Sequence, residues 1–172
     1  MAIPFYDISV ATYLQILPAV AGVLEKGKAY FEQQQIPLDD ALKLSLHPTM
    51  SPLSFQIRSV IHHAVGAMQA VEEGRFQPPS GPDFTFLEGQ ANIAAAIQRL
   101  EQYDANSINE LANNDIIFEI AGNKLPFKAN DFILTFSLPN FYFHATTLYD
   151  ILRMQGVEIG KRDFIGRLRL NL

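Results

Sequence analysis

The residues with the clearest chemical potential lie in the segment LPNFYFHATTLYDILRMQGVEIGKRDFIG (138–166), where Asn140 and His144 are four positions apart. On a helix this spacing places two side chains on one face, one turn or roughly 6 Å apart along the axis. Helical bundles build metal and acid–base sites from inward-facing side chains of this kind. The segment therefore predicts a metal-binding or proton-transferring site on a helix.

The chain has four histidines, the residue type best suited to bind a metal or to carry a proton near neutral pH. His63 lies on the flank of the apolar stripe of a second predicted helix, so His63, Asn140 and His144 could converge on one cavity if the two helices are neighbours. His47, in a Leu-His-Pro segment, is expected to anchor a loop. His62 lies nearly opposite the stripe and is expected to face solvent or an interface.

Two readings of this set remain open. Zinc and nickel favour neutral imidazole, with three protein ligands and an open position at catalytic sites. An asparagine amide oxygen is a weak ligand for either ion and suits harder cations better. In the alternative reading, Asn140 relieves the backbone where Pro139 bends the helix, and His144 is a buried, hydrogen-bonded core histidine.

The elements that must position these residues are four long helices. Apolar residues recur at steps of three and four in each, and a Thr85–Glu88 capping box marks the start of the third. Ser107 and Glu110 repeat that signature for one short turn. The helices are expected over 8–34 with a kink at Pro18, over 51–74, over 85–103, and over 130–155 with Gly156 as its stop.

Between the third and fourth helices, DIIFEIAGNKLPF (115–127) alternates apolar and polar residues around an Ala-Gly-Asn turn. This pattern predicts a small β-hairpin. The polar, proline-rich run RFQPPSGPDF (75–84) reads as a connection. The expected fold is all-α: one four-helix bundle domain, residues 1–172, in up-down-up-down order with the hairpin between helices three and four.

Composition limits the class of protein. A chain of 172 residues buries roughly 70% of its unfolded surface in one domain, and the lack of cysteine excludes thiolate zinc sites and cysteine nucleophiles. No basic leader and no long, purely apolar run is evident, which predicts a cytoplasmic protein with no membrane partner. The net charge of −5 argues against nucleic-acid binding. Basic residues at 161–169 form either a small basic patch or a solvated tail that pairs with acidic helices or with a second subunit.

The chain resembles the DinB/YfiT-like superfamily, and within it a branch of unknown function. The similarity rests on HPTMSPLSFQIR (47–58), His63-Ala64, TFLEGQANI (85–93) and above all the 138–166 segment. In that superfamily one histidine of helix two and a pair four apart on helix four hold a divalent metal, and several members resemble thiol-dependent transferases or isomerases. His63 and His144 match two of these ligands, whereas Asn140 replaces the third.

Two functions follow from these observations. In one, the chain is a bundle, metal-free or weakly metal-binding, that binds a small ligand or self-associates. In the other, His63 and His144 hold zinc or nickel with help from Asn140, and the protein is a metal-dependent transferase or hydrolase of a small, thiol-linked substrate. A homodimer is expected because the aromatic-rich fourth helix and the GKRDFIGRLRL tail offer more apolar surface than a single chain buries.

Overall fold

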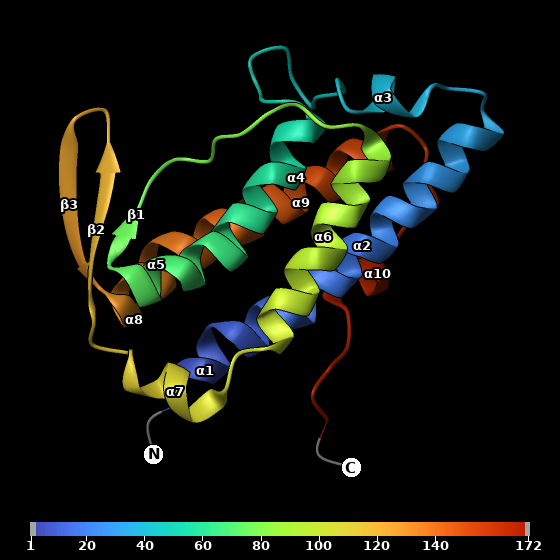
Figure 1. Ribbon diagram of the computed structural model, residues 1–172. Helices are drawn as coiled ribbons and strands as arrows, with labels where there is room; N and C mark the ends of the chain where they lie inside the picture. The colour runs from blue at the N-terminus through green and yellow to red at the C-terminus, as the bar shows by residue number, and fades with distance from the viewer. Residues whose placement is uncertain (1–2, 171–172) are drawn as a thin grey trace.

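The computed structural model describes residues 3–170, which form a mainly helical fold with a small three-stranded sheet at one end (Figure 1). Two of the four long helical segments contain a π-helical turn, η1 or η2. The long segments are α2 (Val10–Gln33), α4–η1–α5 (Leu53–Ile61, His62–Gly66, Ala67–Glu73), α6 (Phe86–Glu101) and α8–η2–α9 (Ala129–Phe132, Ile133–Ser137, Leu138–Met154). The short helices are α1 (Phe5–Ile8), α3 (Leu38–Ala41), α7 (Ala105–Glu110) and α10 (Lys161–Ile165).

The long helical segments follow an up-down-down-up order along the chain (Figure 1). α4–η1–α5 and α6 are parallel, because the Arg58 guanidinium lies over Phe84 at their starting ends and the Tyr103 hydroxyl donates to Glu72 at their finishing ends. α4 also packs on α9 in the antiparallel sense, and α2 packs on both α6 and α9. The up-down-up-down order predicted from the sequence is therefore wrong.

The cause of this difference is the connection between α5 and α6. Residues 77–85 run back along the whole α4–η1–α5 segment before α6 begins (Figure 1). Nine extended residues span roughly 30 Å, about the length of a 20-residue helix. The proline-rich run is thus a full-length crossover, which makes the two helices that it joins parallel.

The sheet contains one strand that the sequence pattern did not reveal. β2 (Asp115–Ile120) and β3 (Asn123–Lys128) pair antiparallel around Ala121 and Gly122, both at positive φ. β1 (Arg75–Phe76) pairs parallel to β2 on its other side. A two-residue strand is too short to show an apolar alternation, so its position depends on the turn at Gly74, which has a φ of 77°.

Helix termini follow local chemistry closely. The predicted capping box is present at the start of α6, where the Glu88 N–H donates to Thr85 Oγ1 and the Thr85 N–H donates to Glu88 Oε2. The second predicted capping signature is wrong: α7 starts earlier, at Ala105, and its N-cap is Asp104, which accepts from the Ser107 N–H. α9 ends at Met154, just before Gly156 with φ +99°.

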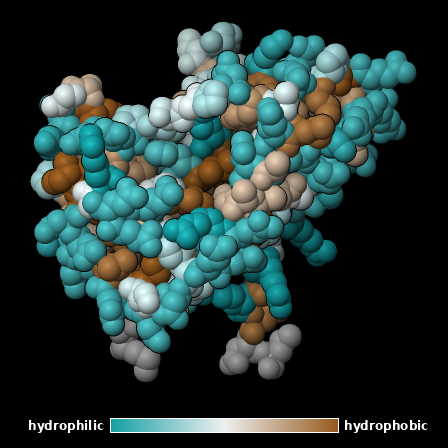
Figure 2. All heavy atoms as spheres, viewed as in Figure 1, coloured by the Kyte–Doolittle hydropathy of each residue, from teal (hydrophilic) through white to brown (hydrophobic). Residues whose placement is uncertain are grey.

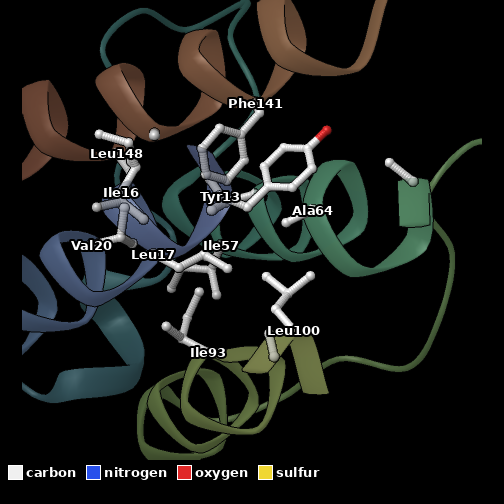
Figure 3. Packing of buried hydrophobic residues seen from close by; sticks show 14 of the residues in the cluster. Tyr13, Ile16, Leu17, Val20, Ile57, Ala64, Ile93, Leu100, Phe141 and Leu148 are labelled. Carbon is white, nitrogen blue, oxygen red and sulfur yellow. The ribbon is translucent and has the colours of Figure 1, made fainter. Parts of the chain in front are cut away.

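The core lies where the long helices meet, and aromatic rings of α2 and α9 are at its centre. Tyr13 and Phe141 are fully buried, with ring centroids 5.0 Å apart in an edge-to-face arrangement (Figure 3). Leu17 of α2 and Ile57 of α4 complete this part of the cluster. The segment Phe5–Gln33 has the length and hydropathy of a membrane span, yet these properties also belong to the core helix of a globular fold.

Candidate functional site

His63 and His144 meet at the interface between η1 and α9. Their ring centroids are 5.8 Å apart and their planes differ by only 14°, so the imidazoles are stacked. The Phe136 ring lies 5.6 Å from His63, and the Phe55 ring lies 5.8 Å from His144. Two of the three residues that the sequence predicted to converge are therefore in contact, inside an aromatic surround.

His144 is held by a side chain on the opposite helix. Its Nδ1 lies 2.7 Å from Gln56 Oε1, and Gln56 Nε2 donates to the Ser51 carbonyl over 2.8 Å. The carbonyl of Ser51 can only accept, which fixes the orientation of the Gln56 amide and leaves Oε1 facing His144. His144 Nδ1 must then carry the proton. In the neutral ring, Nε2 keeps its lone pair for a ligand.

His63 carries an unpaired polar atom in the interior. The side chain is 5% exposed, and its Nδ1 is buried with no hydrogen-bond partner among the described residues. Buried polar atoms are nearly always paired, so an unpaired one calls for a physical explanation. A ligand or an ion bound at this nitrogen would supply the missing partner.

Both imidazoles are neutral at physiological pH. Burial, together with the neighbouring rings of His62 and His144, lowers the pKa of His63 from its usual 6.5 to about 3. Burial also lowers the pKa of His144 to about 4. Neutral imidazole is the form that binds a metal or accepts a hydrogen bond.

Asn140 is engaged with its own helix. Its Nδ2 donates to the Phe136 carbonyl over 2.7 Å, one turn back. Pro139 interrupts the helical hydrogen bonds here. It has no N–H to donate to the Thr135 carbonyl, and the turn before it, η2, is a π-helix. Asn140 thus has the backbone role of the second reading, while its Oδ1 has no partner among the described residues.

The three residues do not amount to a full metal-ligand set. Within residues 3–170 there is no group of three or more His, Cys, Asp or Glu side chains that could hold an ion. Two imidazoles and an amide suit weak binding of a divalent transition metal, because the third ligand is poor. The ligand roles of His63, Asn140 and His144 stay a prediction.

The other two histidines have structural partners. His47 is exposed, and its Nδ1 lies 2.9 Å from the Thr49 hydroxyl, as expected for a loop anchor. His62 is half-buried, with its ring 4.4 Å from Phe76 and its Nε2 2.7 Å from the Gln77 carbonyl. The ring expected to face solvent or an interface is thus partly covered by the chain that leaves α5.

Several residues of the site were missed from the sequence. Gln56 lies seven residues before His63, two helical turns along the same face, and that spacing was the available signal. Ser137 lies three residues before Asn140 and seven before His144. Phe76 falls in the predicted connection and Phe136 in the predicted fourth helix, and nothing in the local pattern indicates that they flank an imidazole.

A separate hollow of about 570 Å³ lies between α4–η1 and α6, under residues 80–84. Its apolar floor includes Ile61, Val65 and Ala96, and Figure 2 shows this apolar stretch between the two helices on a mostly hydrophilic face. Its rim carries Asp83 and Glu88. None of the residues that line it belongs to the histidine pair, so the two features are distinct.

Two charged side chains of the segment 161–169 form ion pairs with residues of other helices. Lys26 of α2 lies 2.6 Å from Asp163, and Arg169 lies 3.4 Å from Asp7. Asp163 also accepts from the Gly160 N–H at the start of α10. Only the Arg169–Asp7 pair joins a basic residue of this segment to an acidic position of the bundle, whereas in the other pair the segment supplies the acid.

Comparisons with known proteins agree with this architecture. The family model described as "Domain of unknown function (DUF1993)" matches residues 5–165. The crystal structure of a DinB family member from Shewanella denitrificans is similar, with a TM-score of 0.80, 25% sequence identity, and coverage of 97% of this chain and 94% of that one. No curated protein matches the chain. By its sequence and its helical architecture, the chain belongs to the DUF1993 family and has a DinB-like fold.

Proposed function

We propose that the protein binds a small ligand at the His63–His144 pair, and that the same pair holds a divalent transition metal weakly. The observation that carries this proposal is the state of the two rings. They are stacked 5.8 Å apart, both are neutral, His63 Nδ1 has no partner among the described residues, and Gln56 leaves His144 Nε2 free. Two unshared imidazole nitrogens on facing helices are a binding site for a hydrogen-bond donor or a cation.

The weakness of the metal site follows from its third position. Transition metals bind tightly when three or four good ligands are present, and an asparagine amide is a poor one for zinc or nickel. His144 has the outer-shell partner typical of metal-bound histidine, since its Nδ1–H donates to Gln56 Oε1. His63 has no such partner. We expect affinity well below that of a three-histidine site.

A second candidate function is a metal-dependent transferase or hydrolase acting on a small, thiol-linked substrate. The buried, partnerless nitrogen of His63 favours it over a purely structural role. A divalent ion at such a site would supply Lewis-acid polarisation and a more acidic bound water or thiol. The chain's own contribution would be to hold two neutral imidazoles in an aromatic, water-poor surround.

Titration of untagged protein with Co²⁺ tests the site. We expect binding that the His63→Ala and His144→Ala substitutions each weaken at least tenfold, because each removes one of two imidazoles. His47→Ala is the matched control: its ring is exposed and contacts Thr49, and binding should be unchanged. The measurement is calorimetry, with cobalt absorption as a second readout. Equal affinity in the parent and both site variants would place the ion elsewhere.

Self-association is the second part of the proposal. Large apolar side chains on the fourth helical segment remain exposed in the single chain, including Leu134 at 49%, Tyr142 at 39% and Phe143 at 57%. The Phe143 ring also contacts His144, with centroids 5.3 Å apart, so this surface adjoins the candidate site. Exposed apolar groups of this size favour a protein contact.

Light scattering during size-exclusion chromatography tests for the homodimer. We expect a dimer at micromolar concentration, and we expect Phe143→Glu to give a monomer because it buries a charge in the contact. Leu87→Glu is the control, since Leu87 is equally exposed, at 55%, but lies on α6. A monomeric parent, or a dimer that Leu87→Glu dissociates and Phe143→Glu does not, would contradict this surface.

A further inference from the structure

We infer that Tyr13 and Ser137 are positioning residues for His63, acting through a chain of hydrogen bonds that ends on the His63 carbonyl. Ser137 Oγ lies 2.6 Å from that carbonyl oxygen, and the Tyr13 hydroxyl lies 2.9 Å from Ser137 Oγ. This series of hydrogen bonds crosses from α2 through η2 to η1. It therefore ties the backbone of one predicted ligand to two other helical segments.

The direction of each hydrogen bond is determined by chemistry. A carbonyl oxygen only accepts, so Ser137 must donate its single hydroxyl proton to His63. The Tyr13 hydroxyl must then be the donor to Ser137 Oγ. Burial raises the pKa of Tyr13 well above its usual 10, so the phenol keeps the proton that this donation needs. Each member therefore has one role, and none can be reversed.

The series of hydrogen bonds supplies a donor to the His63 carbonyl, which lies in the π-helical turn η1. In an α-helix the Ala67 N–H would donate to the His63 carbonyl, four residues back. At η1 the Ala67 N–H is directed instead at the Ala64 and His62 carbonyls, three and five residues back. The Ser137 hydroxyl supplies a donor to the His63 carbonyl at this point. π-helical turns of this kind occur often at functional sites, and here a hydroxyl from the facing turn η2 is built into one.

The three residues of this hydrogen-bond series are buried, so surrounding side chains restrict where their polar atoms can lie. Tyr13 and Ser137 are both 0% exposed, and the Tyr13 ring packs edge-on against Phe141. Figure 3 shows the Tyr13 ring beside Phe141, with its hydroxyl directed away from the aliphatic cluster. Because the hydroxyl pair fixes where the His63 backbone lies between the helices, it also fixes where the His63 imidazole meets His144. The positioning role of Tyr13 and Ser137 rests on the proposed function of the histidine pair.

The test measures ring position separately from metal binding. In the parent, nuclear Overhauser effects should connect the ring protons of His63 and His144. We expect Ser137→Ala to weaken these effects at least twofold. We also expect it to lower Co²⁺ affinity about tenfold, as does the loss of a hydrogen bond that orients a metal-binding residue. Tyr13→Phe keeps the packed ring and should shift both readouts in the same direction by less. Ser59→Ala is the matched control, because Ser59 is a buried serine of α4 whose hydroxyl has no partner among the described residues.

The outcomes separate the two claims. If the parent binds no Co²⁺, the metal part of the proposed function fails, while the ring contacts still decide the positioning roles. If a folded Ser137→Ala variant keeps the parent ring contacts, the positioning inference is wrong. Should Ser137→Ala fail to fold, as judged by circular dichroism, the isosteric Tyr13→Phe variant decides in its place: unchanged ring contacts there overturn the inference, and weakened contacts support it.

Discussion

Lowering the pH from 7 to 4.5 is expected to reduce the free energy of unfolding by about 4 kcal/mol, with about 2 kcal/mol from each of His63 and His144. Burial lowers the pKa of His63 to about 3 and that of His144 to about 4, whereas both are near 6.5 in the unfolded chain. Below pH 6.5 the two histidines therefore bind protons in the unfolded state but stay largely unprotonated in the native state. Stability is full above pH 6.5 and falls as the pH drops toward the native pKa values.

Carboxyl groups act in a lower pH range. Hydrogen bonds from Thr85 lower the pKa of Glu88, and those from Ser107 lower the pKa of Asp104. The stability these groups contribute is present above their unfolded pKa values, near 4, and is lost as the pH falls through the folded ones. The interval from pH 6.5 to 4.5 therefore reports mainly on buried histidine.

Urea unfolding at a series of pH values measures this effect. The double variant His63→Gln, His144→Gln should show a much flatter dependence between pH 6.5 and 4.5, whatever its stability at pH 7. His47→Gln is the control, since this ring is exposed and lies outside the histidine pair, and the variant should follow the parent. A double variant that keeps the parent's slope would assign the acid sensitivity to other groups.

Replacing Phe141 with alanine is expected to cost about 3–5 kcal/mol of stability. The Phe141 side chain is fully buried where α9 meets α2, and its ring packs against Tyr13 with centroids 5.0 Å apart. The substitution removes most of an aromatic side chain from the core and leaves a cavity that the neighbouring helices cannot fully close. The loss also removes the ring that packs against Tyr13, so the His63–His144 contact should loosen with it.

The neighbouring residue supplies the control. Tyr142 is an aromatic residue on the same helix but is 39% exposed, and Tyr142→Ala should cost less than about 1.5 kcal/mol. Thermal and urea unfolding of the two variants at pH 7 give the comparison. Equal losses from Phe141→Ala and Tyr142→Ala would mean that this part of the core does not hold α9 to α2.

Much of the local structure was predictable from residues close in the sequence. The apolar periodicity of 10–31 led to α2, and Thr85 with Glu88 led to the start of α6, because both signals act within a few turns of one helix. The resemblance carried by the 138–166 segment led to the DinB-like fold. The order of the helices was not predictable in this way, since the length of 77–85 allows a crossover but no local pattern requires one.

By itself, the sequence determined which residues share a helix face: the i, i+4 spacing puts Asn140 and His144 on the same side of one helix. Only the tertiary structure decided their partners. Gln56 meets His144 across 88 positions, Ser137 meets His63 across 74, and Tyr13 meets Ser137 across 124. Such contacts depend on how helices pack and on where π-helical turns shift the register. Those features arise when side chains far apart in the chain compete for the same buried space.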